Sequence, residues 1–62
     1  LKIQGAEIQS LVLYDLAGTI VLEQVENSTY TSVLDMGMLQ RGIYLLKVKS
    51  NQREEYIRIL KD

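Results

Sequence analysis

The sequence predicts an all-β protein, and three observations lead to that fold class. Short apolar segments rich in Leu, Ile and Val alternate with polar or glycine-containing breaks at intervals of about ten residues. No apolar segment keeps the i, i+3, i+4, i+7 spacing of an amphipathic helix over the length that a helix needs. Sixty-two residues are enough for one small domain. We therefore expect a single domain, residues 1–62, folded as an antiparallel β-sandwich.

About six strands are expected, and the breaks between them carry turn signals. Asp15 can accept the N–H groups of a hairpin turn, and Gly18 can take the positive φ that closes it. Gly42 can likewise supply an unusual φ where a strand restarts after a tight turn. The expected strands span residues 1–4, 8–14, 19–25, 30–36, 43–49 and 54–61. The side chains expected in the core are Leu11, Leu13, Leu34, Leu39, Tyr44, Leu46 and Ile59.

Composition excludes several classes of function. The net charge is −1, with seven basic residues scattered among eight acidic ones, so there is no basic stripe for nucleic acid. The longest apolar runs are far shorter than the roughly 20 residues of a membrane helix, so we expect no membrane insertion. The chain has no His and no Cys, which removes the commonest general base, the thiol nucleophile and thiolate metal ligands. We expect no enzyme activity, no catalytic residues, no metal site and no cofactor.

Two polar motifs have structural interpretations that outweigh chemical ones. Asp15 and Asp35 could form a glycosidase-type carboxylate pair, but Asp15 opens a turn and Asp35 ends a strand. Asn27-Ser28-Thr29 matches a glycosylation acceptor, although three-residue matches often arise by chance.

Two apolar features are weighed in the same way. Met36 and Met38 could form a soft binding patch, but filling the core beneath a turn is the better interpretation. The four tyrosines fall on four different expected strands and could line a sugar-binding face; without Trp, a half-exposed sheet surface is favoured instead.

Three segments, in order, resemble the sorting domain found at the C-terminus of cargo proteins of the type IX secretion system of Bacteroidetes. Residues 11–18, Leu-Val-Leu-Tyr-Asp-Leu-Ala-Gly, are similar to that family's apolar strand ending in Tyr-Asp-x-x-Gly. Residues 34–48 resemble its Ile-Asp-Leu-Ser-x-Leu-x-x-Gly-x-Tyr segment and the strand that follows. Residues 57–61, Ile-Arg-Ile-Leu-Lys, resemble its closing strand. The family usually has Pro shortly before the glycine that matches Gly42, and an opening strand introduced by Pro-Asn-Pro; both are missing here.

The resemblance implies an immunoglobulin-like β-sandwich that acts as a sorting signal and not as a catalyst. Such a domain folds in the periplasm of a Gram-negative bacterium and is recognised by the outer-membrane secretion machinery. A sortase-like enzyme commonly removes it as the cargo reaches the cell surface. The positions carried over are Asp15, Gly18, Leu34, Asp35, Leu39, Gly42, Tyr44 and Lys61. Most of them shape turns or pack; Lys61, expected to be exposed, is the candidate for direct recognition, with a solubilising terminal lysine as the alternative.

An alternative function is an immunoglobulin-like spacer or adhesion module of a larger surface or secreted protein. The chain begins at Leu1 and not at Met, so we interpret it as part of a longer protein. If the family's first strand is missing, one sheet edge is unpaired, and such edges recruit partners. We then expect the isolated chain to dimerise edge to edge, to aggregate, or to be held by the upstream domain of its parent protein.

Overall fold

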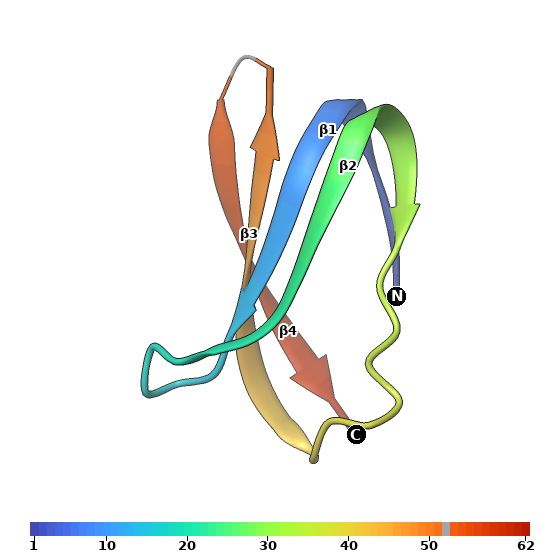
Figure 1. The fold of residues 1–62 in the computed structure, drawn as a ribbon. Helices are drawn as coiled ribbons and strands as arrows, with labels where there is room; N and C mark the ends of the chain where they lie inside the picture. Colours follow the sequence, from blue (N-terminus) through green and yellow to red (C-terminus); the bar gives the residue numbers. More distant parts are fainter. Residues whose placement is uncertain (52) are drawn as a thin grey trace.

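The computed structural model describes residues 1–51 and 53–62, with residues 5 and 6 described in backbone only. Its described part contains four strands: β1 (Lys2–Tyr14), β2 (Ile20–Val33), β3 (Gly42–Ser50) and β4 (Glu54–Lys61). They form one sheet in the order β2-β1-β3-β4, and every neighbouring pair is antiparallel (Figure 1). The predicted all-β antiparallel class is confirmed. Among the described residues, no helix is long and apolar enough to cross a membrane.

Four long strands take the place of the six short ones that the sequence predicted. The expected strands 1–4 and 8–14 are two parts of β1. The expected strands 19–25 and 30–36 are largely two parts of β2, which ends at Val33. Both strands run through the breaks because the β1–β2 pairing resumes beyond them: Gln4 pairs with Thr31, Ile8 with Thr29 and Ser10 with Val25.

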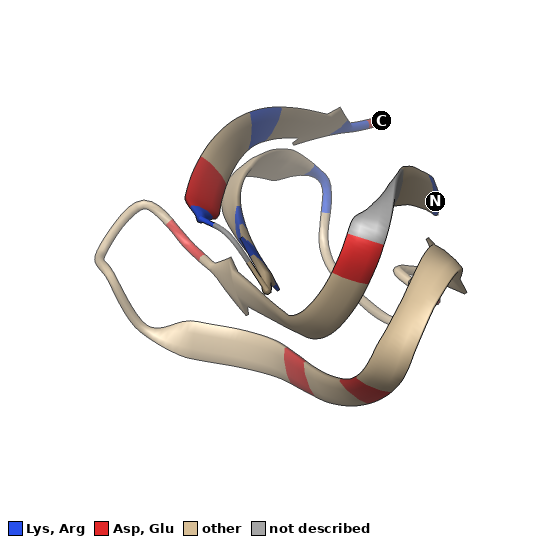
Figure 2. Cartoon of the chain, turned by 90° about the horizontal axis from the view of Figure 1, so that it is seen from above, with Lys and Arg blue, Asp and Glu red and all other residues tan. Residues whose placement is uncertain are grey.

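Those two breaks are instead the places where β1 and β2 bend together. The register between these strands shifts on either side of Ile8, which pairs with Thr29. Glu7 and Ser28 lie next to this pair, and both have φ of 52°, a conformation that non-glycine residues seldom adopt. Irregular pairing of this kind bends a strand and increases its twist. The sheet consequently curls on itself, as Figure 2 shows from above, and makes the two layers of a broadly immunoglobulin-like sandwich.

The core lies inside the curl, where paired positions of neighbouring strands face the same side. Leu13 of β1 pairs with Leu46 of β3, and both are fully buried. Of the seven predicted core residues, five are buried, while Leu39 and Ile59 are half-buried and pack against the cluster. Among the described residues, the sequence did not single out four further buried apolar residues, Ile3, Ile8, Val12 and Val48, nor the buried Ser32.

Candidate functional site

The turn after β1 has the geometry that its sequence predicted. The Asp15 carboxylate accepts hydrogen bonds from the backbone N–H groups of Ala17 (3.0 Å) and Thr19 (2.9 Å) through Oδ1. Gly18 has φ of 86° and donates its N–H to the Asp15 carbonyl (3.0 Å). A β-carbon at Gly18 would meet no atom within 4 Å, so the glycine is required by its φ and not by close packing. Both residues therefore shape the turn.

The segment between β2 and β3 begins with a residue anchored to the first residue of the chain. Leu34 is buried, donates its N–H to the Leu1 carbonyl (2.7 Å) and accepts from the Leu1 amino group (3.0 Å). The Asp35 carboxylate then accepts the Gly37 N–H (2.9 Å). Leu39 donates its N–H to the Met36 carbonyl (3.1 Å), which closes a tight turn. Hydrogen bonds of Leu34, Asp35 and Leu39 thus hold this short segment at three points.

Tyr44 on β3 forms a hydrogen bond to the C-terminal part of that segment. Its side chain is 8% exposed, and its hydroxyl donates to the Gln40 carbonyl at 2.6 Å. Gly42 lies between the two residues in the chain. Its φ is 154°, a backbone conformation that residues other than glycine rarely adopt. The unusual φ that the sequence predicted for Gly42 is confirmed, and its sign is positive.

Lys61 is not the free, exposed side chain that the sequence suggested. Its ammonium group donates to the carbonyls of Met36 (2.5 Å) and Leu39 (2.6 Å), and the residue is half-buried. The β3–β4 register explains this position, because Lys61 pairs with Gly42 and so lies beside the segment. Pairing the expected strands 43–49 and 54–61 outward from the break between them could have revealed this neighbour; the sequence interpretation considered only the end of the chain.

The eight candidate residues gather at one end of the molecule, which we call the motif end. It consists of the turn of residues 15–18, the segment of residues 34–42 with Tyr44, and Lys61 at the end of β4. In Figure 1 the 34–42 segment and the end of β4 lie side by side at the lower right, and the turn of residues 15–18 projects at the lower left. Six of the eight are joined through the 34–42 segment, whereas Asp15 and Gly18 form a separate turn beside it.

The two methionines of the segment differ. Met36 is half-buried and packs against the core, as predicted. Met38 is 97% exposed, so the expectation that it fills the core is wrong. The tight turn that buries Leu39 points its neighbour outward, and spacing alone did not reveal which methionine would lie inside.

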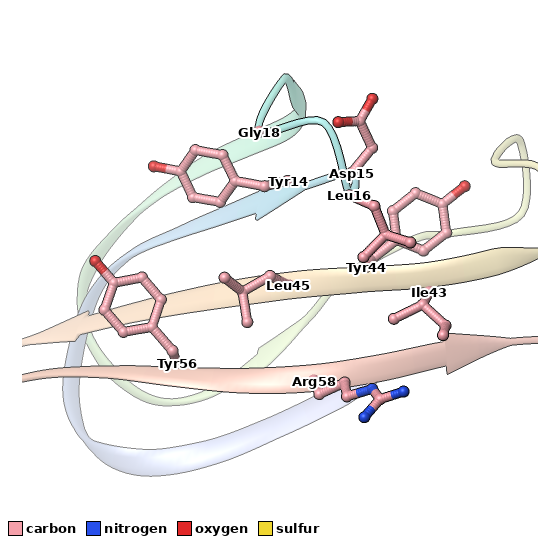
Figure 3. Close-up of a pocket in the computed structure, with 9 residues that line it drawn as sticks. All are labelled: Tyr14, Asp15, Leu16, Gly18, Ile43, Tyr44, Leu45, Tyr56 and Arg58. Atoms are coloured by element: carbon pink, nitrogen blue, oxygen red, sulfur yellow. The ribbon is translucent and has the colours of Figure 1, made fainter.

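An open groove of about 590 Å³ lies on the outer face of the sheet, beside the motif end (Figure 3). Tyr14, Leu45 and Arg58 are consecutive partners across β1, β3 and β4, and Tyr56 lies next to them. The groove is lined mostly by apolar surface, and its polar lining residues are three tyrosines, one aspartate and one arginine: Tyr14, Tyr44, Tyr56, Asp15 and Arg58. The four tyrosines do not form one face: Tyr14, Tyr44 and Tyr56 line the groove, with Tyr44 also packed in the core, whereas Tyr30 of β2 is not among its lining residues.

Charges are distributed over the strands without a basic stripe. In Figure 2 the acidic residues of β2 lie apart from the basic residues of β3. Lys47 and Glu54 form an ion pair across β3 and β4 (2.8 Å), which lowers the pKa of Glu54 and raises that of Lys47. The pKa of Glu26 is lowered because its carboxylate accepts hydrogen bonds from Ser32 (2.6 Å) and Gln24. Within residues 1–51 and 53–62, no three carboxylates gather into a group that could hold a metal ion.

Comparison with known proteins identifies the family. The family model described as the secretion system C-terminal sorting domain matches residues 1–62. No curated protein and no solved structure matched the chain. The family match covers the whole chain, including all three segments whose order first suggested it. The chain therefore belongs to the family of type IX secretion C-terminal sorting domains.

Proposed function

We propose that this chain is a non-catalytic sorting signal that directs its parent protein across the outer membrane to the cell surface. Family membership supports the coarser statement that the parent is a secreted or cell-surface protein of a Gram-negative bacterium. The finer steps belong to the proposal. The domain folds in the periplasm, binds the outer-membrane type IX machinery, and is removed by a sortase-like enzyme.

One observation supports this function best: the second and third motif segments are joined by direct contacts. Lys61 lies 22 residues beyond Leu39 in the chain, yet its ammonium donates to the Leu39 carbonyl. A sorting signal benefits from residues that hold its recognition surface in one arrangement, because a receptor binds more tightly to a surface that is already ordered. We propose that the machinery recognises the motif end as one surface, and that Lys61 contributes by holding the 34–42 segment in place.

The test is an export assay with a secreted reporter that carries the module at its C-terminus, joined through its native preceding residues. We expect the reporter outside the cell in a host with the type IX machinery, and in the periplasm of a host without it. Deleting Glu54–Lys61 together with Asp62 should abolish export, because the deletion removes a sheet edge and the contact of Lys61 with the segment.

A matched pair of variants separates the motif end from the rest of the surface. Lys61→Met should reduce export, whereas Val25→Ser, an exposed apolar position on β2, should leave it unchanged. If the unaltered module leaves the reporter in the periplasm of the competent host, the sorting function is refuted and the spacer function replaces it.

A further inference from the structure

The two edges of the sheet are not equivalent as surfaces for pairing with another strand. β2 is one edge, and its ladder to β1 shifts register at three places. β4 is the other edge, and it pairs with β3 from Glu54 to Lys61 without a shift. Among the described residues, only β4 therefore presents a regular row of backbone groups that another strand can bind.

The side chains of β4 also favour a partner. Tyr56 is 59% exposed, Ile57 42% and Leu60 70%, so apolar surface lies open on both faces of this edge strand. Exposed, regular, apolar edges pair with other chains unless something blocks them. Arg58 on the same strand lines the groove of Figure 3, and within the described part of the chain it has no ion-pair partner.

We propose that β4 pairs antiparallel with β4 of a second copy of this chain, with Tyr56 opposite Tyr56. A two-fold axis normal to the sheet keeps the outer faces of both copies on one side and pairs residues symmetrically about a central residue. In the register centred on Tyr56, Glu54 of each copy lies opposite Arg58 of the other. Opposite charges in directly paired cross-strand positions are stabilising.

The neighbouring registers bring like charges together. A register centred on Ile57 puts Arg53 opposite Lys61. A register centred on Arg58 puts the two Arg58 side chains against each other and Glu54 opposite Asp62 twice, three like-charge pairs against the two attractive pairs of Glu55 with Lys61. Like charges in paired positions are destabilising, so the charge pattern of β4 selects the register centred on Tyr56.

The paired form would be a continuous eight-stranded sheet in which the two grooves adjoin across the Tyr56 pair. Glu54 already lies 2.8 Å from the Lys47 ammonium, so its carboxylate would face a cation on each side. An aromatic pair at the centre, flanked by charge pairs, would cover the exposed apolar side chains of this edge.

Sedimentation equilibrium of the chain tests the interface. We expect a monomer–dimer equilibrium for the unaltered chain. Arg58→Glu should weaken dimerisation at least about tenfold, because two cross-strand pairs change from attraction to repulsion. Glu54→Arg with Arg58→Glu should restore it. Glu23→Arg changes an exposed charge on β2 and should have no effect. A chain that stays monomeric at high concentration, or a double variant as weak as Arg58→Glu, overturns the proposal.

A cysteine placed in this cysteine-free chain tests the register. Residues directly opposite in an antiparallel pair have Cα atoms about 4.5–5.5 Å apart, within the range for a disulfide. Tyr56→Cys should therefore form a disulfide-linked dimer under mild oxidation, whereas Leu60→Cys, exposed on the same face, should not, because it lies far from its symmetry mate. Equal cross-linking of both variants would refute this register. Circular dichroism of each reduced variant checks that it is folded.

Discussion

The Tyr44 hydroxyl donates to the Gln40 carbonyl four residues earlier, at 2.6 Å, and closes a loop around Gly42. A tyrosine that bonds back to the backbone just upstream is a hallmark of immunoglobulin-like sandwiches, where it is called the tyrosine corner. Here the corner holds the segment that also carries Leu39, so a feature of the fold and a family motif coincide in the same six residues.

Removing this hydroxyl should weaken the fold while the ring stays packed. Tyr44→Phe should lower the free energy of unfolding by about 1 kcal/mol, the usual value of a hydrogen bond of this kind. Urea unfolding followed by circular dichroism measures the change. Tyr30→Phe is the matched control, because Tyr30 is 63% exposed, and it should change stability by a few tenths of a kcal/mol at most. Equal effects of the two substitutions would show that the corner contributes nothing.

A second prediction concerns the φ of 154° at Gly42. Gly42→Val should destabilise the fold by about 1 kcal/mol or more, since β-branched residues tolerate positive φ badly. The cost is conformational, because a β-carbon there meets no atom within 4 Å. Arg41→Val introduces the same side chain at the preceding exposed residue and should cost much less. A near-zero change for Gly42→Val in the same urea experiment would contradict the prediction.

The sequence predicted the local features of the fold better than its long-range ones. The Asp15 turn, the Gly42 bend and the alternation of Tyr44 and Leu46 follow from spacing within a few residues, and the structure has them all. The polar residues 26–29 were interpreted as a break between strands. In the structure β2 continues through them, because it pairs with β1 on both sides of residues 26–28, at Val25 and at Thr29.

The role of Lys61 depended on the same kind of long-range information. In the sequence Lys61 is a basic residue near the end of the chain, and such residues are commonly exposed. Only the register of β4 against β3 brings its ammonium to the Met36 and Leu39 carbonyls. Sequence reasoning singled out Lys61 as a candidate, and its role in recognition stays a prediction, but the sequence could not show what Lys61 contacts.

A third prediction concerns acid stability. The pKa values of Glu26 and Glu54 are lowered in the folded chain from 4.5, by hydrogen bonds from Ser32 and from Lys47 respectively. A lowered folded pKa stabilises the fold above the unfolded pKa, and this stabilisation is lost as the pH falls through the folded value. The urea midpoint should therefore fall between about pH 5 and about pH 3, and fall less when both residues are changed to Gln. An identical fall in the double variant would refute this. The raised pKa of Lys47 has no part here, since its stabilisation is lost only at alkaline pH.

The last prediction separates the structural role of Lys61 from its charge. Lys61→Met keeps most of the aliphatic stem and removes the ammonium that donates to Met36 and Leu39. We expect a loss of about 1 kcal/mol in urea unfolding, below the usual value for charge-assisted hydrogen bonds because the site is partly exposed to water. The Leu39 amide, which bonds to the Met36 carbonyl, should exchange its hydrogen faster in this variant, since the turn opens more often.

Two control variants show whether Lys61 stabilises the 34–42 segment through its hydrogen bonds or only through its positive charge. Lys61→Arg keeps a cationic donor and should recover most of the stability and the Leu39 protection. Lys49→Met removes the same charge from an exposed position on β3 and should leave both unchanged. If Lys61→Met behaves like Lys49→Met in both measurements, Lys61 does not brace the segment. Any loss of export in Lys61→Met would then have to come from direct contact between Lys61 and the secretion machinery.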